Sequence, residues 1–445
     1  DEIKTAVRRL APNHDIVITE IGGTVGDMES LPFLEAIRQF RQDVGRQHTL
    51  FIHLTLIPYI AAAGELKTKP TQHSARELME IGIQPDVLIC RSDREITDDI
   101  KRKIALFTNV DVAGVIEARD VDTIYDVPMM FNRQRLDELA VEKLGLEAEA
   151  ESPDLSGWQA MVDRIRHPDG GRVKIAMVGK YTSLVDAYKS VNEALIHGGI
   201  ANDVGVEIDW ISSEKFENGE SLEWMNEYHG LLIPGGFGER GIEGMLRVIE
   251  WARTHDLPFF GICLGLQCAV IEYARNVVGL HDSHSVEFSG EAEDPVICLM
   301  DSQRQVTDMG GTMRLGAYPC VIQEGSRAHE AYGALEISER HRHRYEVNNN
   351  YRDSLAEAGL RFSGQSPDGN LVEIAELPDH PWFLGCQFHP ELKSRPMRPH
   401  PLFAAFIKAA RTRRDGREPA GEGERPDAGE DVSRQADAEP ASVPS

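Results

Sequence analysis

Apolar and β-branched runs alternate with amphipathic segments along the first third of this 445-residue chain. Runs at residues 15–21, 48–58 and 85–91 have the length and composition of buried strands. Residues 31–44, between the first two runs, repeat apolar positions at the spacing of a helix face. Because strands that alternate with helices build a parallel sheet covered by helices, we expect an α/β domain over residues 1–145.

A change of composition divides the chain near its middle, as expected for a length that usually holds two domains. Residues 146–171 are rich in Glu, Ala, Ser, Pro and Gly, which is typical of an interdomain linker. The strand patterns beyond it predict a second doubly wound α/β domain over residues 172–411, with antiparallel strands added after about residue 294. These patterns lie at residues 173–181, 206–212, 230–238, 257–265, 313–323, 343–348 and 371–378.

The last segment, residues 412–445, consists mostly of Pro, Gly, Glu and Ala and has almost no apolar side chain to bury. We therefore expect it to be disordered. No run of 18 or more uncharged apolar residues occurs, so the sequence predicts no membrane span. The charged first ten residues carry neither a signal-peptide core nor an initiating Met, and we interpret them as mid-helix sequence of a longer natural chain.

The charge balance argues against two classes of partner. The chain has 47 Lys and Arg against 73 Asp and Glu, a net charge of −26, which disfavours binding to nucleic acid or to anionic membranes. Six cysteines are scattered without a C-x-x-C pair, which argues against a zinc knuckle and a disulfide framework. We expect a cytoplasmic protein with no nucleic-acid or membrane partner.

The motif Gly261-Ile-Cys263-Leu-Gly265 follows an apolar strand pattern and precedes a helical one. Glycines two residues either side of a nucleophile permit a tight strand-to-helix turn that raises the side chain above the sheet edge. At a helix N-terminus the helix dipole favours the thiolate form of a cysteine. Taken alone, the motif could equally hold an ordinary buried cysteine.

A base and a carboxylate follow another strand-like run, in Cys386-Gln-Phe-His389-Pro-Glu391. Their spacing of two places both side chains on one face of an extended segment. His389 would accept the thiol proton and Glu391 would orient the imidazole ring. One histidine among 16 is weak evidence by itself, and its pairing with Cys263 makes it a candidate.

A glycine-rich turn, Pro234-Gly-Gly236-Phe-Gly238, could direct backbone N–H groups at a developing oxyanion. Together with Cys263 and the His389 motif, in this order on an α/β background, it resembles the class I glutamine amidotransferase family over residues 173–408. The resemblance implies hydrolysis of L-glutamine through a Cys263 thioester, with Gly236 near the oxyanion.

The same resemblance assigns the groups that would hold the substrate. Glu287 and Arg344 would bind the α-amino and α-carboxylate groups of glutamine. Arg344 lies in a basic run, residues 340–348, that read alone could equally be a solvated strand. The residues implied to line the site beside the nucleophile are Leu264, Gly265, Leu266 and Gln267.

Two polar clusters in the first domain suit a nucleoside triphosphate. Glu20 ends an apolar run before a glycine turn, where a carboxylate can reach a Mg²⁺ bound to phosphates, although a solvent-facing loop acid is the simpler interpretation. The second cluster joins two lysines to hydroxyl and amide groups around a stiffening proline, as triphosphate oxygens require. It consists of Lys67, Thr68, Lys69, Pro70, Thr71 and Gln72.

Long stretches around both clusters resemble the synthetase domain of the CTP synthase family. They are residues 16–36 and 64–74, and residues 310–317 and 339–349 of the second domain resemble the same family. The resemblance implies that Glu20 is a Mg²⁺ ligand. It further implies contacts of Asp27, Met28 and Glu29 with CTP, of residues 67–72 and Lys103 with UTP or CTP, and of Arg119, Asp120 and Val121 with the ATP base.

The reaction implied by this resemblance joins the two domains. ATP phosphorylates the uracil 4-oxygen of UTP, and ammonia from the glutaminase displaces phosphate to give CTP. GTP would activate glutamine hydrolysis, CTP would act as a feedback inhibitor, and the family assembles into homotetramers.

Three hypotheses remain open from the sequence. The first is a full CTP synthase. The second is an enzyme that only hydrolyses glutamine, because the family's glycine-rich phosphate loop is absent and Gly179-Lys180 does not replace it, since position 174 is Lys where that pattern requires Gly. The third is a non-catalytic scaffold that senses nucleotides.

Overall fold

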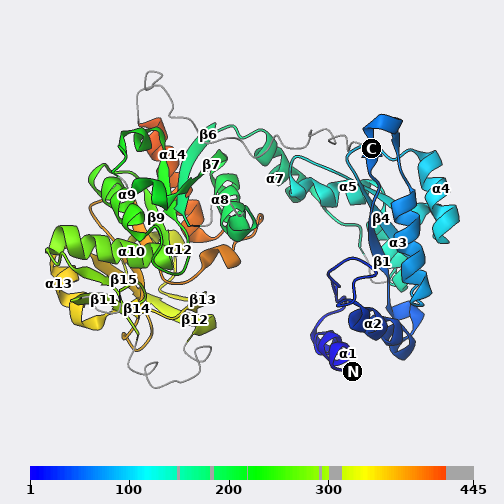
Figure 1. The fold of residues 1–445 in the computed structure, drawn as a ribbon, viewed down its shortest axis with the longest axis horizontal. Helices are drawn as coiled ribbons and strands as arrows, with labels where there is room; N and C mark the ends of the chain where they lie inside the picture. Colours follow the sequence, from blue (N-terminus) through cyan, green and yellow to red (C-terminus); the bar gives the residue numbers. More distant parts are fainter. Residues whose placement is uncertain (148–150, 181–184, 218, 290–292, 300–312, 417–445) are drawn as a thin grey trace, which may run out of the picture. The chain divides into compact units, whose positions relative to one another are not determined.

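The computed structural model describes residues 1–147, 151–180, 185–217, 219–289, 293–299 and 313–416, and it divides into two compact units between Arg166 and His167 (Figure 1). The predicted tail at residues 417–445 lies outside the described residues. No helix in the described segments is long and apolar enough to cross a membrane.

The first unit is built on a parallel sheet with strand order β1-β4-β5, beside a short hairpin formed by β2 and β3. Helices and strands alternate along this unit, as the sequence predicts. Its strands are β1 (Ile52–Leu56), β2 (Tyr59–Ile60), β3 (Glu65–Leu66), β4 (Val87–Ser92) and β5 (Val115–Arg119). Its helices are α1 (Glu2–Arg8), α2 (Leu31–Val44), α3 (Lys69–Glu80), α4 (Asp98–Thr108), α5 (Val127–Arg133), α6 (Leu136–Leu144) and α7 (Ser156–Arg166).

The strand predicted at residues 15–21 is wrong. This segment has no regular secondary structure, and Ile16 and Ile18 are 57% and 92% exposed. A strand needs a neighbour that accepts and donates its backbone hydrogen bonds, and no described strand pairs with this segment. The apolar run alone could not reveal that missing partner.

The linker predicted at residues 146–171 is partly wrong as well, because α7 lies within it and is fixed to the first unit. The indole Nε1 of Trp158 donates a hydrogen bond to the carbonyl of Tyr125 at 2.6 Å, and Arg166 pairs with Asp126 at 2.9 Å. Buried apolar side chains on one face of α7 explain why a segment with linker-like neighbours folds.

The second unit contains, among the described residues, a nine-stranded sheet with the order β13-β12-β15-β16-β17-β9-β8-β6-β7. Strands β17, β9, β8, β6 and β7 are parallel, and the other four extend the sheet with antiparallel pairings, as predicted. Its strands are β6 (Arg172–Gly179), β7 (Gly205–Ser212), β8 (Gly230–Ile233), β9 (Phe259–Ile262), β12 (Arg314–Ile322), β13 (Glu336–His343), β15 (Arg361–Gln365), β16 (Val372–Glu376) and β17 (Phe383–Cys386).

A smaller described sheet, β10 (Ser283–Ser285), β11 (Asp294–Cys298) and β14 (Glu346–Val347), adjoins α10. Helices complete the unit and cover both faces of the parallel strands (Figure 1). They are α8 (Lys189–Asn202), α9 (Ile242–Thr254), α10 (Leu264–Tyr273), α12 (Arg327–Tyr332), α13 (Arg352–Glu357) and α14 (Pro401–Asp415).

Strand β9 lies in the middle of the core, and its side chains pack into the hydrophobic clusters on both faces of the sheet. Phe259 packs into the cluster under α9 and α10, whereas Phe260 and Ile262 pack on the other face against α14. All ten residues of α10 are buried. The segment that joins β9 to α10 is therefore fixed by packing on every side.

Helix α14 continues to Asp415, past the tail boundary that the composition predicted at residue 412. Arg413 Nη1 donates to the carbonyl of Asp256 at 2.6 Å, and Arg414 Nη1 donates to that of Arg172 at 3.0 Å. These bonds extend the helix by binding its last turn to the body of the unit.

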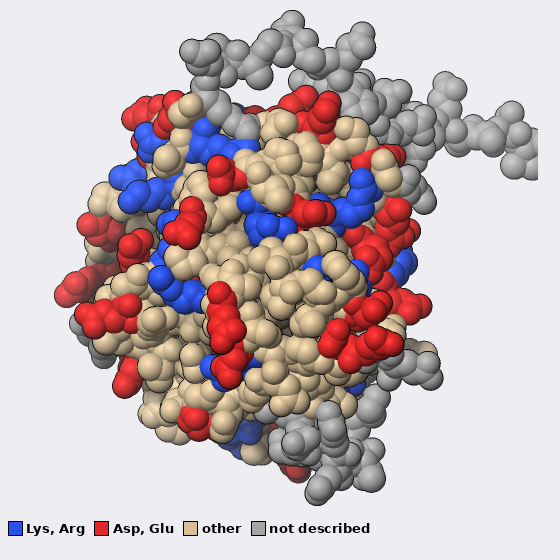
Figure 2. Space-filling model, turned by 90° about the vertical axis from the view of Figure 1, so that its left-hand side faces the viewer, with Lys and Arg blue, Asp and Glu red and all other residues tan. Residues whose placement is uncertain are grey.

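Charge is mixed on the face shown in Figure 2. Among its described residues, Lys and Arg side chains alternate with Asp and Glu and do not gather into one broad basic patch.

A buried ion pair connects α9 to α10 and gives a test of the core. Arg253 bonds both carboxylate oxygens of Glu272, which is fully buried, at 2.6–3.1 Å. Arg253→Met removes the charged partner of that carboxylate and leaves only the Asn276 amide donating to it, so we expect the free energy of unfolding to fall by about 3–5 kcal/mol. Urea denaturation followed by tryptophan fluorescence measures the change.

The double variant Arg253→Met with Glu272→Met removes both charges and should lose less stability than the single variant. Arg172→Met breaks an exposed pair with Glu207 in the same unit and should cost about 1 kcal/mol or less. Equal losses for Arg253→Met and Arg172→Met would contradict this account of the core.

Candidate functional site

Cys263 occupies the sharp turn between β9 and α10 that the sequence predicts. It is the N-cap residue of α10 and has φ 52° and ψ −97°, a conformation that non-glycine residues rarely adopt. A Cβ on Gly261 would lie 2.6 Å from the backbone of Gly265, and one on Gly265 would lie 2.3 Å from the carbonyl oxygen of Ile233. Both glycines are therefore required by close packing.

His389 and Glu391 follow β17 and lie beside the nucleophile. His389 Nδ1 is 2.7 Å from Glu391 Oε1, and the carboxylate can only accept, so the ring donates this hydrogen bond. The backbone N–H of His389 donates to the carbonyl of Arg340 at 2.7 Å. Burial disfavours the protonated ring, but Cys263 and Glu391 outweigh it and raise the pKa of His389 to about 10.

The glycine turn after β8 closes over this pair. A Cβ on Gly235 would lie 2.9 Å from His389 Cε1 and 3.7 Å from Cys263 Cβ, so the bare backbone of the turn lies against both residues. A Cβ on Gly236 would lie 3.0 Å from the side chain of Leu264. Backbone N–H groups placed this close to a nucleophile can bind an oxyanion.

The role of Lys180 is not predicted by the sequence, in which Gly179-Lys180 only resembles, and does not complete, a phosphate loop. Lys180 is buried at the end of β6, and its Nζ donates to the carbonyls of Phe237, at 3.2 Å, and Gly238. Burial lowers the pKa of Lys180. The amine thus fixes the carbonyl side of the glycine turn, and Glu287 Oε1 accepts from the N–H of Gly238 at 3.0 Å.

The other predicted glutamine contacts lie on α10 and on the segment that follows β13. Residues 264–267 form the first turn of α10 and are buried, and Gln267 Nε2 donates to the carbonyl of Tyr345 at 3.2 Å. Arg344, which precedes Tyr345, is half-buried. The fold therefore brings the backbone beside Arg344 to the helix that carries the nucleophile.

The basic run at residues 340–348 is only partly a solvated strand. Arg340 and Arg342 of β13 are exposed, whereas His341 and His343 are buried. Burial, with the charge of Arg314 close by, lowers the pKa of His341 to about 2, so this ring is neutral. Alternation along one strand, and not the charge of the run, decides which side chains face water.

A second missed residue contacts the nucleophile directly. Gln387, between Cys386 and Phe388 and fully buried, places Nε2 at 3.6 Å from the Sγ atom of Cys263. The period of two along a strand could have identified it, because it lies two positions before His389 on the same side.

In the first unit, the predicted triphosphate cluster forms the N-terminus of α3. Thr68 is the N-cap, and Lys69 and Pro70 are the first helical residues and are exposed. Free backbone N–H groups and the positive end of the helix dipole favour phosphate at such a position. The lysines therefore lie where the helix itself attracts anions.

Two side chains of that cluster already form hydrogen bonds within the protein. Thr71 is fully buried, and its hydroxyl donates to the carbonyl of Leu56 at 3.1 Å, so it does not face solvent as a phosphate ligand would. Gln72 Nε2 donates to the hydroxyl of Thr68 at 3.1 Å. These bonds attach α3 to β1 and shape its first turn.

Lys103 of α4 lies near the same turn. A hydrogen bond from Lys67 and, more weakly, the charge of Lys103 hold the pKa of Glu65 below its usual range. Arg119 is the last residue of β5, Asp120 and Val121 follow it, and Asp120 accepts from Arg91 Nε at 2.8 Å. Because all three strands of the sheet are parallel, β5 ends at the carboxyl edge where such sheets bind ligands.

The predicted metal and product residues lie on the loop before α2. Glu20, Met28 and Glu29 are exposed, and Asp27 Oδ2 accepts from the N–H of Thr24 at 2.8 Å. In the described part of the chain, no three or more His, Cys, Asp or Glu side chains gather as a metal site. One exposed carboxylate still suits Mg²⁺, which takes one or two protein carboxylates together with phosphate oxygens and water.

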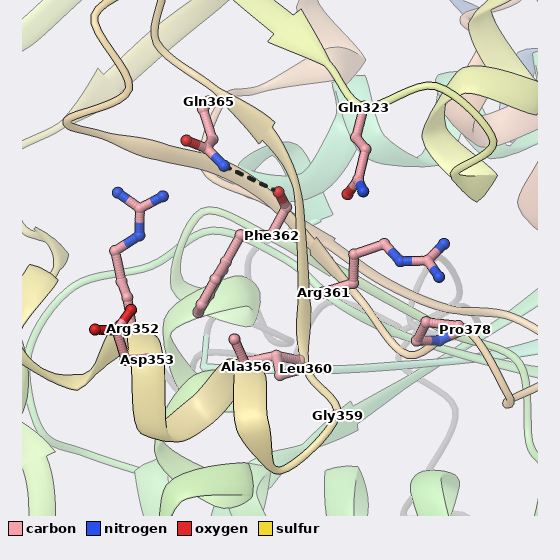
Figure 3. Close-up of a pocket in the computed structure, with 10 residues that line it drawn as sticks. All are labelled: Gln323, Arg352, Asp353, Ala356, Gly359, Leu360, Arg361, Phe362, Gln365 and Pro378. Carbon is pink, nitrogen blue, oxygen red and sulfur yellow. Dashed lines mark hydrogen bonds between the residues drawn. The ribbon is translucent and has the colours of Figure 1, made fainter.

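Another hollow of the second unit, about 490 Å³, is lined mainly by α13 and β15 (Figure 3). Arg352 and Arg361 lie on either side of Phe362 there. Arg352 Nη1 donates to the carbonyl of Gly369 at 2.8 Å, and Arg361 Nη1 lies 3.5 Å from Glu376 Oε1. Because both guanidinium groups already have protein partners and no catalytic candidate lines the hollow, we do not assign it a ligand.

The raised pKa of His389 predicts a pH-dependent contribution to stability. The folded value, about 10, exceeds the ordinary 6.5, so the contribution is complete below pH 6.5 and is lost as pH rises through 10. We expect His389→Gln to lower the melting temperature more at pH 6 than at pH 10. The exposed His281→Gln is the control, and an equal decrease for His389→Gln at both pH values would refute the assignment.

Comparisons with known proteins agree with this geometry. Residues 1–146 match the family model of the CTP synthase N-terminus, and residues 183–409 match that of class I glutamine amidotransferases. The CTP synthase of Geotalea uraniireducens is 57% identical over 410 residues, which is 92% of this chain and 76% of that protein. That of Geobacter sulfurreducens is 57% identical over 417 residues, 94% of this chain and 77% of that protein.

A solved structure matches the second unit. The glutaminase domain of Trypanosoma brucei CTP synthase with bound acivicin is 38% identical, with a TM-score of 0.50, and the match covers 54% of this chain and 94% of that one. Family models and relatives together span both units of the chain. The chain belongs to the CTP synthase family.

Proposed function

We propose that this chain hydrolyses L-glutamine at Cys263 and uses the ammonia to aminate UTP to CTP with ATP. The observation that carries the first half is the strained Cys263 turn beside the His389–Glu391 pair. Membership of the CTP synthase family supports the second half.

Glutamine hydrolysis follows from the chemistry of these three residues. His389 accepts the thiol proton, and the thiolate of Cys263 attacks the side-chain amide carbon of glutamine. The C–N bond breaks as His389 returns the proton to the nitrogen, which leaves ammonia and a thioester. Water, deprotonated by His389, then cleaves the thioester to give glutamate and the free thiol.

Each tetrahedral intermediate carries an oxyanion that needs donors. The backbone of the Pro234–Gly238 turn supplies them, and Lys180 holds this turn by its carbonyl oxygens. Glu287, already bonded to the N–H of Gly238, would bind the α-amino group, and Arg344 the α-carboxylate. Recognition of the substrate is thereby linked to the shape of the oxyanion site.

In the first unit, the N-terminus of α3 with Lys67, Lys69 and Lys103 would bind the triphosphate of UTP or CTP. Arg119, Asp120 and Val121 would line the ATP base pocket at the edge of the sheet. Glu20 would help to hold Mg²⁺, which neutralises phosphate charge when bound. The second half-reaction consumes UTP, ATP and ammonia and forms CTP, ADP and phosphate, with a new C–N bond, so the enzyme is a ligase.

Regulation and assembly are proposed from the family alone. GTP would activate glutamine hydrolysis, CTP would inhibit, and the protein would form homotetramers. A cytoplasmic location agrees with the six cysteines, which are all buried and form no disulfide.

Loss of the thiol tests the first half of the proposal. Cys263→Ala should abolish glutamate release from glutamine, with and without GTP, and leave any CTP formation from UTP, ATP and added ammonia unchanged. Cys268→Ala removes an equally buried thiol five residues further along and should retain glutaminase activity. Glutamate release that survives in Cys263→Ala would disprove the assignment of the nucleophile.

Loss of one lysine tests the triphosphate site. Lys69→Met should raise the KM for UTP by about tenfold in the ammonia-dependent assay, because a charge-assisted phosphate contact is lost. Arg76→Met, on the same helix but exposed and further from its N-terminus, is the matched control. A KM for UTP that responds equally to both changes would place the triphosphate elsewhere.

A further inference from the structure

Two buried glutamines lie beside the nucleophile. Gln387 has no role in the mechanism described above, and Gln267 is expected only to line the substrate site. Gln387 is 0% exposed and Gln267 is 3% exposed. Amide groups lose their hydrogen bonds to water on burial and must replace them inside the protein. Their partners therefore show how each amide is used.

Hydrogen bonding fixes the orientation of both amides. Gln267 Nε2 donates to the carbonyl of Tyr345 at 3.2 Å and to Gln387 Oε1 at 3.4 Å. A flipped Gln387 would turn its NH₂ group towards that of Gln267, so that two donors would face each other. The partner of Gln267 thus determines that Nε2, and not Oε1, of Gln387 faces Cys263.

The backbone holds this donor against the sulfur. Gln387 N–H donates to the carbonyl of Glu373 at 2.8 Å, and Cys263 N–H donates to the carbonyl of Cys386 at 2.7 Å. These bonds join the end of β17 to β16 on one side and to the nucleophile turn on the other. Gln387 Nε2 reaches the Sγ atom of Cys263 at 3.6 Å, which is hydrogen-bond range for sulfur.

We propose that Gln387 is a further catalytic residue, whose Nε2 donates a hydrogen bond to the Cys263 thiolate, and that Gln267 positions it. The inference rests on the glutamine hydrolysis proposed above. A donor to the charged form of a group favours that form, so Gln387 stabilises the thiolate before attack.

The same bond assists the second half of the reaction. The sulfur loses its negative charge when the thioester forms and regains it when water cleaves the thioester. A better stabilised thiolate is also a better leaving group, so the donor favours cleavage of the C–S bond. Gln387 therefore acts on the sulfur, whereas the glycine turn acts on the oxygen of the same intermediate.

The test measures the ionisation of the thiol directly. Alkylation of Cys263 by iodoacetamide, followed by peptide mass spectrometry across pH, reports the thiolate because the thiolate is the nucleophile. Gln387→Met keeps the side-chain volume and removes the donor, so its alkylation profile should move to higher pH by about one unit. The kcat for glutamine should fall by about tenfold with a smaller change in KM.

Two further variants and a control separate this role from a merely structural one. Gln387→Glu keeps the shape and places a carboxylate against the thiolate, so it should move the profile upward at least as far as Gln387→Met. Gln267→Met removes the group that orients the Gln387 amide, so it should move the alkylation profile in the same direction by a smaller amount. Gln323→Met, an exposed glutamine of the same unit, should leave it unchanged.

Unchanged alkylation profiles in both Gln387 variants, at melting temperatures near that of the parent chain, would overturn the proposal. If Gln387→Met fails to fold, Gln387→Glu alone decides by its profile. The alkylation readout does not require turnover. Failure of the proposed hydrolysis at Cys263 is recognised separately, by a parent chain that releases no glutamate or by glutamate release that persists in Cys263→Ala.

Discussion

The close approach of α10 to β8 and β9 governs the geometry of the glutaminase unit. Gly261 and Gly265 allow the backbone of α10 to lie where any side chain would collide. This close approach forces Cys263, between them, to adopt a positive φ of 52°. The surrounding core, with all of α10 buried, supplies the packing that retains this strain. The sulfur is thus placed by contacts made mostly by apolar residues that take no part in the chemistry.

Different polar groups then act on different sides of that sulfur. The ring of His389 is held on one side by Glu391 and by its own backbone bond to Arg340. The glycine turn on the other side is braced by Lys180, and the amide of Gln387 contacts the sulfur itself. These groups follow the ends of three strands of one sheet, β17, β8 and β6, which is why the site needs the whole unit to form.

The sequence predicted the parts of the fold whose cause is local. The alternation of apolar runs identified most strands, and the glycine spacing around Cys263 identified its turn, because both depend on neighbouring residues. It failed at residues 15–21, where a strand would need a partner elsewhere in the chain. It also failed at α7 and at the end of α14, where bonds to distant carbonyls extend the helices.

The candidate site shows the same difference between residues found by local patterns and residues whose role depends on distant contacts. Cys263, His389 and Glu391 stand in short motifs, so spacing and family resemblance could find them together. Lys180 acts through carbonyls more than fifty residues away, and Gln387 through an amide whose orientation a third residue determines. Such roles depend on tertiary contacts. A period of two places Gln387 on the side of His389, but it does not show which atom its amide contacts.

The backbone at Cys263 also restricts which nucleophiles this fold can accept. Branched carbons at Cβ are strongly disfavoured at φ 52°, so threonine cannot take the place of cysteine without distorting the turn. Serine fits the same backbone, but a hydroxyl lacks the acidity of a thiol and would ionise far less beside His389. The turn at Cys263 therefore leaves cysteine as the practical nucleophile. An amidotransferase of this architecture remains susceptible to thiol oxidation, because a site that admits the substrate also exposes the thiol.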